Sequence, residues 1–68
     1  MLDWIDVGHF RNGALHGKGK RTYANGEYYV GDFLDGVPWG QGILYAPDGT
    51  VLKAGYWWNG SGPNDFGE

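Results

Sequence analysis

Residues 8–19, GHFRNGALHGKG, return 23 positions later as residues 31–42, GDFLDGVPWGQG. The two stretches share their glycines, one phenylalanine and one turn dipeptide at the same places. The register continues beyond them, because the Asn-Gly pair at 25–26 matches the Asp-Gly pair at 48–49. Self-similarity at a fixed period is the mark of a repeat architecture, in which each unit buries its face against a neighbour. The sequence therefore predicts a repeat protein.

Glycine is the residue type that carries the repeat. Fourteen of the 68 residues are glycine, about three times the roughly 7% average, and they come without richness in proline or serine. Backbone geometry therefore explains them better than linker disorder does. Five glycines of the first unit recur in the second: Gly8, Gly13, Gly17, Gly19 and Gly26 match Gly31, Gly36, Gly40, Gly42 and Gly49.

A third unit begins one residue late, with Gly55 and Trp57, and then decays. Asn64 and Phe66 stand where the pattern requires glycine, so we interpret the tail SGPNDFGE as a truncated or capping unit. Met1 and this decay favour a complete chain. The predicted organisation is one domain with repeats at about 6–28 and 29–52 and a partial unit at 53–68.

Turn dipeptides indicate the fold class. Five Asn-Gly or Asp-Gly pairs occur, and these favour tight turns because both positions tolerate a positive φ. Five turns in so short a chain leave no room for long helices. We therefore predict an all-β fold, an antiparallel meander of stacked β-hairpins with five or six short strands. The segments richest in β-forming residues are 20–23, 28–33, 43–45 and 56–58.

Alternation along a strand predicts the core. Residues 29, 31 and 33 share one face of their strand, which places Phe33 beside a glycine that leaves room for a ring. Phe10 and Trp57 occupy the equivalent positions in the other units. We expect these three aromatics to form a buried ladder, each ring contributing about 1.5 to 3 kcal/mol by area.

Composition limits the classes of function. The formal net charge of -3 argues against general nucleic-acid binding, and the absence of cysteine removes disulfides, thiolate metal sites and cysteine nucleophiles. No secretory signal precedes the repeats, and no apolar run approaches the roughly 20 residues of a spanning helix. We expect a soluble, cytoplasmic protein.

Catalytic chemistry has few candidates in this sequence. Ser61 lacks the surroundings of a nucleophile, and His9 and His16 have no spacing typical of a metal site. The turn aspartates Asp35 and Asp48 are expected to serve turn geometry. We predict a protein that is not an enzyme and has no catalytic, metal or cofactor site.

Two surfaces are candidates for binding. Tyr28, Trp39 and Trp58 cannot all share the face of the core, and exposed Trp and Tyr are typical of protein interfaces. Unpaired edge strands offer a second route, including self-association. The alternative surface is a basic patch that would contact an anionic membrane: Arg11, Lys18, Lys20 and Arg21.

The pattern G-x-F-x-[ND]-G-x-x-x-G-x-G, followed by A-N-G or P-D-G, resembles the MORN repeat, most closely over residues 10–31. The resemblance implies a sheet of stacked hairpins and roles in protein binding, dimerisation or phospholipid contact. It favours a non-catalytic interaction or scaffold module whose partner is another protein. Two alternatives stay open: a peripheral phospholipid-contact module, and a small antagonist that inhibits a larger enzyme.

Overall fold

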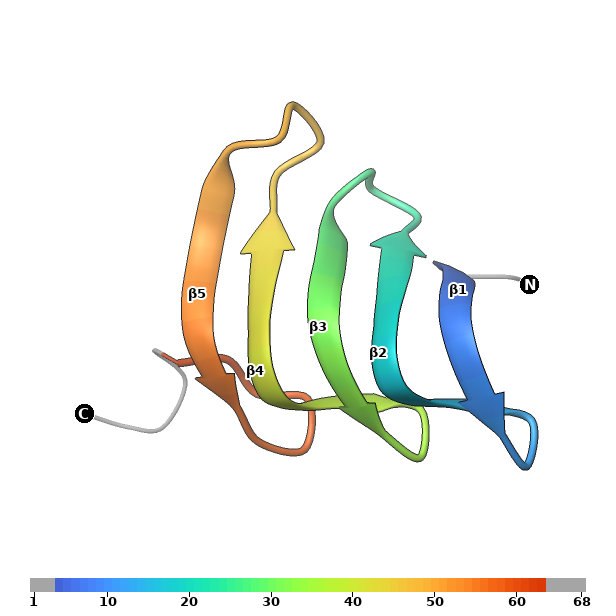
Figure 1. The fold of residues 1–68 in the computed structure, drawn as a ribbon. Helices are drawn as coiled ribbons and strands as arrows, with labels where there is room; N and C mark the ends of the chain where they lie inside the picture. Colours follow the sequence, from blue (N-terminus) through green and yellow to red (C-terminus); the bar gives the residue numbers. More distant parts are fainter. Residues whose placement is uncertain (1–3, 64–68) are drawn as a thin grey trace.

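A computed structural model describes residues 4–63, which form one five-stranded antiparallel sheet and no helix. The strands follow one another in chain order across the sheet, so the fold is an open meander (Figure 1). The predicted all-β meander of stacked hairpins is confirmed, and no helix able to cross a membrane occurs in the described part. The strands are β1 (Trp4–Arg11), β2 (Ala14–Tyr23), β3 (Tyr28–Leu34), β4 (Val37–Tyr45) and β5 (Val51–Trp57).

The five predicted turn dipeptides all lie in turns. Three of them form tight turns at one end of the strands. In these the Asn or Asp has a φ between 48° and 53° and the glycine a φ between 82° and 88°, the pair of positive values that a type I′ hairpin turn requires. In the two longer turns at the other end of the strands, the side chains of Asn25 and Asp48 accept hydrogen bonds from the backbone N–H two residues later, at 3.0 and 2.9 Å. The residues of the three tight turns are Asn12-Gly13, Asp35-Gly36 and Asn59-Gly60.

A row of glycines crosses the whole sheet. Its members lie opposite one another in all four strand pairs, and the space that their side chains would take is occupied by neighbouring side chains or by the backbone of the adjacent strand. A Cβ on Gly19 would lie 3.2 Å from the ring of Phe33, and one on Gly42 would collide with the phenol of Tyr29. The glycine row is Gly8, Gly19, Gly31, Gly42 and Gly55.

The strands are longer than the predicted segments. β2 and β4 continue through Gly17 and Gly40, whose φ values of 87° and 113° bend the chain without ending the ladder. Both strands curve where they approach the lower edge of the sheet in Figure 1. In a sequence, such a glycine predicts the end of a strand. In this structure it bends a strand that continues on both sides of it.

The core lies on one side of the sheet, which we call the inner face. Tyr29 is at its centre, with its ring edge-on to Phe33 at 5.1 Å and to Trp57 at 4.9 Å. The Tyr29 hydroxyl donates to the carbonyl of Asp32 at 2.9 Å, and Trp57 Nε1 donates to the carbonyl of Gly42 at 3.0 Å. Leu15 completes the buried cluster.

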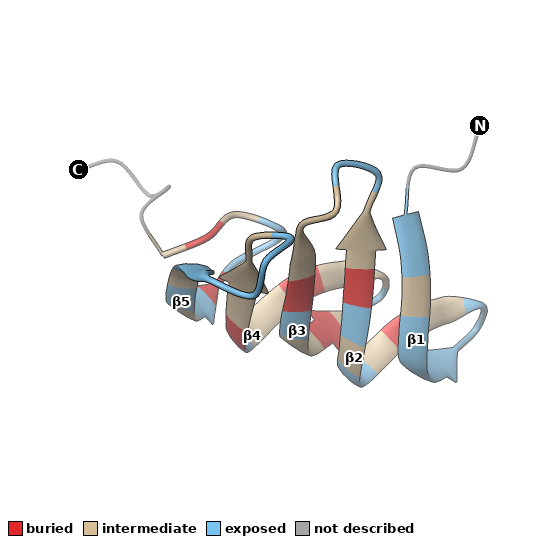
Figure 2. Ribbon diagram, turned by 90° about the horizontal axis from the view of Figure 1, so that it is seen from above, coloured by how far each residue is buried: buried red, intermediate tan, exposed pale blue. Residues whose placement is uncertain are grey.

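The prediction that Phe10 belongs to the buried ladder is wrong. Phe33 and Trp57 are 3% and 5% exposed, but Phe10 is 54% exposed. Phe33 packs over Gly19 of the hairpin before it, and Trp57 donates a hydrogen bond to Gly42 of the hairpin before it. Phe10 lies on β1, the first strand of the described sheet, so no earlier hairpin covers its ring (Figure 2).

The third unit turns back on itself. A bridge between Trp58 and Ser61 closes the turn after β5, and Gly62 is then buried against the Trp57 ring. Pro63 follows over Gly55, 3.1 Å from where a Cβ would stand. In the described part this tail covers the inner face of β5 and does not form a sixth strand. The rest of the predicted capping unit, residues 64–68, lies outside the described residues.

Candidate functional site

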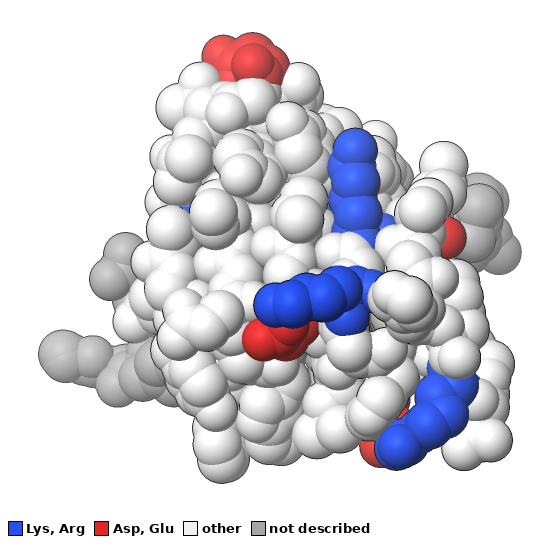
Figure 3. Space-filling view, in the orientation of Figure 1, with Lys and Arg blue, Asp and Glu red and all other residues white. Residues whose placement is uncertain are grey.

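The outer face, opposite the core, carries much exposed apolar surface between scattered charged side chains. Its central row runs across all five strands, and Ile5 and Val7 are among the most exposed residues at its β1 end. Figure 3 views this face, in which most of the surface is neither acidic nor basic. Exposed apolar surface gathered on one face of a sheet is typical of an interaction surface. The central row consists of Val7, Lys20, Val30, Ile43 and Ala54.

Tyr28, one of the predicted interface residues, is half-buried on the outer face. It lies opposite Tyr45, and the two rings stack with centroids 4.9 Å apart. Lys20 Nζ lies 4.7 Å from the centre of the Tyr28 ring. Sequence reasoning missed Tyr45, although the glycine register, once extended along β3 and β4, places it directly across from Tyr28.

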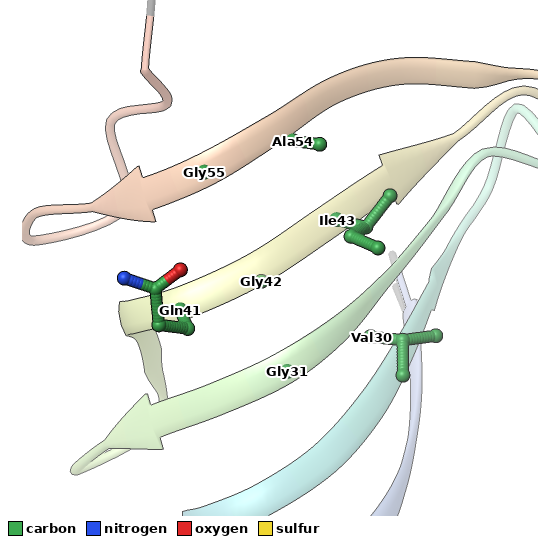
Figure 4. A pocket seen from close by; sticks show the side chains of 7 residues that line it. All are labelled: Val30, Gly31, Gln41, Gly42, Ile43, Ala54 and Gly55. Carbon is green, nitrogen blue, oxygen red and sulfur yellow. The ribbon is translucent and has the colours of Figure 1, made fainter.

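The glycine row leaves a shallow hollow of about 380 Å³ on the outer face, across β3, β4 and β5. Figure 4 shows the side chains of Val30, Ile43 and Ala54 on one side of the glycines and Gln41 on the other. The hollow is mostly apolar and too open to enclose a small molecule. The residues that line it are Val30, Gly31, Gln41, Gly42, Ile43, Ala54 and Gly55.

A second hollow, of about 320 Å³, lies on the inner face beside the core. Burial raises the pKa of the Tyr23 phenol, while the nearby Arg21 opposes that rise. Burial likewise raises the pKa of Tyr29, so both phenols stay protonated across the physiological range. The residues that line the hollow are Tyr23, Asn25, Glu27, Leu44, Lys53, Trp57 and Gly60.

Trp39 and Trp58 form a pair. Their ring centroids are 4.8 Å apart with planes tilted by 46°, which joins β4 to the turn after β5. Trp39 is half-buried by this contact, whereas Trp58 stays 52% exposed. The structure therefore brings together two of the three predicted interface residues and leaves Tyr28 at a separate place.

The predicted basic residues do not gather in one patch. Arg21 is 6% exposed and points to the inner face, where its guanidinium meets the Asp6 carboxylate at 2.8 and 3.0 Å. The same group lies 4.3 Å from the ring centre of Trp4. Arg21 therefore does not share a surface with Lys18 and Lys20.

The other three cations do not form one patch either, and Figure 3 shows the basic side chains of the face that it views in separate places. Lys18 Nζ is 2.6 Å from Asp32, and Arg11 is 3.6 Å from Asp35, so a carboxylate offsets each charge. Lys20 lies over the Tyr28 ring. This arrangement presents far less positive potential than four gathered cations would.

Residues with catalytic potential are dispersed. Between residues 4 and 63, no three His, Asp or Glu side chains converge as a metal ion would require. His16 Nδ1 accepts a hydrogen bond of 3.4 Å from the backbone N–H of Asp35 and lies 3.7 Å from its carboxylate. Hydrogen bonds from Thr50 lower the pKa of Asp48, which matches its predicted role in a turn.

Comparison with protein families gives one finding. The family model described as MORN repeat matches residues 7–28 and 29–51, which together make up about two thirds of the chain. The first match spans most of the β1–β2 hairpin and the second spans β3 and β4. No curated protein and no solved structure matches the chain.

Proposed function

This chain belongs to the MORN-repeat family, and we propose that it is a non-catalytic module that binds another protein through the paired rings of Trp39 and Trp58. MORN repeats are in general non-catalytic units found in protein or membrane contacts. The observation that supports protein binding is the tryptophan pair. Trp58, a large apolar side chain, is half exposed to water, and the ring of Trp39 holds it in place.

Such a pair suits a binding site for energetic reasons. A tryptophan has only two side-chain torsions. When its ring is already fixed, the side chain therefore loses little conformational entropy on binding a partner. Tryptophan is also the residue type most enriched at positions where truncation costs 2 kcal/mol or more of binding energy. The contact between Trp39 and Trp58 supplies this fixing within the free protein.

Polar groups lie at the same end of the strands as the tryptophan pair, on the side toward β1. Arg11 and Trp58 occupy equivalent positions in the first and third units, each next to a tight turn. Asp35, in the tight turn before β4, lies 3.6 Å from Arg11 of β1 and 3.7 Å from His16 of β2. An apolar centre with a polar rim is the usual anatomy of a protein interface.

The test is a pull-down from the native host's lysate with tagged wild type beside a Trp39→Ala, Trp58→Ala double variant, at low and high salt. Leu52→Ala is the control, because Leu52 is also exposed on β5 but lies away from the pair. We expect one stoichiometric protein that wild type and Leu52→Ala retain at high salt and the double variant loses. With that partner purified, the loss should be at least about 30-fold in Kd, which corresponds to about 2 kcal/mol.

The same experiment separates the other functions. If the partner is an enzyme and its activity falls on adding this protein, the module is an antagonist rather than a scaffold. Retention by the double variant that equals wild type would contradict the proposal. Salt-sensitive sedimentation with anionic vesicles that Lys18→Glu, Lys20→Glu abolishes would support phospholipid contact instead, although the pairing of Lys18 with Asp32 weakens that surface.

A further inference from the structure

β1 has one edge that no strand of the described sheet covers. Strands β2, β3 and β4 have a neighbour on both sides, whereas β1 pairs only with β2. The backbone N–H and C=O groups on the free side of β1 are thus a template for another strand. The repeat itself shows what kind of strand fits there.

β3 and β5 are the copies of β1 in the later units, and each meets an earlier strand at the side that is free in β1. In β2 the first glycine of a Gly-x-Gly sequence, Gly17, lies opposite Phe33, and the second lies opposite Gly31. In β4 Gly40 likewise lies opposite Trp57, and the second glycine, Gly42, lies opposite Gly55. Both pairings are regular here, without the register shift that occurs on the hairpin side of β3.

The two glycines of the earlier strand have different roles: Gly17 has a φ of 87° and nothing within 4 Å of where a Cβ would stand, whereas Gly19 makes room for the aromatic ring. Phe33 leans over Gly19, where a Cβ would lie 3.2 Å from the ring, and Trp57 donates to the carbonyl of Gly42. Those two rings are almost fully buried. Phe10, at the same position of β1, is 54% exposed because its edge has no such neighbour.

We propose that the free edge of β1 binds an extended segment of a partner protein that runs antiparallel to β1 and carries glycine-x-glycine. The first glycine lies opposite Phe10 and the second opposite Gly8. The segment extends the glycine row by one strand and covers the Phe10 ring, as β2 covers Phe33. Backbone hydrogen bonds provide affinity, and the two glycines provide specificity.

A second copy of this chain does not supply the segment. The two strands that carry Gly-x-Gly, β2 and β4, have both edges occupied inside their own sheet. The remaining glycine-x-glycine, Gly60-Ser61-Gly62, lies in the last turn, and its second glycine is packed on Trp57. The site is also separate from the tryptophan pair, because β1 and β5 are opposite ends of the sheet (Figure 1).

The probe is a synthetic peptide with blocked ends that copies residues 15–23, LHGKGKRTY. Its control has valine in place of both glycines. Valine has a higher β propensity than glycine, so unspecific strand pairing would favour the control peptide. If the ring of Phe10 must pack over a glycine, the control peptide should bind more weakly. Binding is followed by amide chemical shifts and by hydrogen exchange of the isotope-labelled protein.

We expect the glycine peptide to shift β1 amides and slow their exchange, and the valine peptide to bind at least about tenfold more weakly. Phe10→Ala should weaken the glycine peptide by a similar factor, and Trp58→Ala should leave it unchanged. Phe10→Leu, which keeps most of the apolar bulk, should retain binding and serves as a second variant if the alanine variant melts early. The wild-type comparison of the two peptides needs no variant to fold.

Three results would overturn the proposal. One is equal binding of the two peptides, and another is a set of shifted amides outside β1. The third is a concentration-dependent dimer of the free protein, seen by sedimentation, that Phe10→Ala abolishes; the edge would then serve a second copy. If the peptide fails while the pull-down succeeds, the edge proposal falls and the tryptophan proposal stands.

Discussion

The phenol of Tyr29 occupies the place where a side chain on Gly42 would begin. Gly42 itself has no positive φ, so its role is to be small rather than to relieve backbone strain. Gly13 has the opposite role. Its φ is 82°, and nothing lies within 4 Å of the place where a Cβ would stand. The same residue type is thus required for two distinct physical reasons.

Replacing these two glycines by alanine separates the reasons. Gly42→Ala should force Tyr29 out of its place and destabilise the fold by about 1 to 3 kcal/mol, the usual cost of overpacking a core. Gly13→Ala should cost only about 1 kcal/mol, from a left-handed backbone in an alanine. Urea denaturation measures both. If Gly13→Ala were the more damaging change, steric exclusion by Tyr29 would not be what keeps Gly42 small.

At the residue scale, sequence predicted what depends on one position and its strand. The turn dipeptides, Phe33 and Trp57 are such cases, because local geometry and alternation decide them. Phe10 could not be predicted in this way, since its burial depends on a strand before it. The sequence predicts Arg21 to be a surface cation beside Lys20, and only the register of β1 with β2 shows that Asp6 is its partner on the inner face.

β1 is held to the sheet by an unusual contact for so small a protein. Where β3 has Tyr29, the first unit has Asp6, and this carboxylate accepts two hydrogen bonds from Arg21 on β2. Both side chains are largely out of water, and the guanidinium also lies over the rings of Trp4 and Phe33. The ion pair thus links β1 to the aromatic core, in addition to the edge-on contact of Trp4 with Tyr23.

Removing one partner of this pair should be costlier than removing both. Asp6→Ala leaves the Arg21 charge buried without its carboxylate, and breaking such a pair typically costs about 3 to 5 kcal/mol. A double variant, Asp6→Leu with Arg21→Met, leaves no buried charge and should be clearly more stable than Asp6→Ala. Guanidinium chloride would screen the pair, so the comparison is made by urea denaturation. A double variant as unstable as the single one would show that the two side chains are not coupled.

At the element scale the sequence predicted the order and direction of the strands but not their lengths. The predicted segments stop near glycines, whereas β2 and β4 pass through them. The pairing of Trp39 with Trp58 was missed for a related reason. Each residue was a predicted interface candidate, but their contact follows from the register of β4 with β5, which no single segment reveals.

The whole molecule is a row of strands in which the backbone of each strand contacts that of its neighbours in sequence. The two ends of this row differ. At the β5 end, the tail packs on Trp57 and Gly55 and closes the inner face. At the β1 end, almost every residue of the strand is exposed and Phe10 has no covering strand (Figure 2). A nearest-neighbour fold of this kind opens first where its interface is weakest.

We therefore expect unequal protection of backbone amides in native-state hydrogen exchange. The β1–β2 hydrogen bonds should exchange through an opening of lower free energy than those between β3 and β4, where Tyr29, Phe33 and Trp57 pack together. Bonds between β4 and β5 should stay close to the global value, because the tail holds β5. Asp6→Ala should lower the protection of β1 amides further. Of the four strand pairs, β4–β5 should lose the smallest fraction of its protection. Equal free energies of opening for all four strand pairs would mean that the sheet opens as one unit. The β1 strand would then be as well protected as the strands of the core.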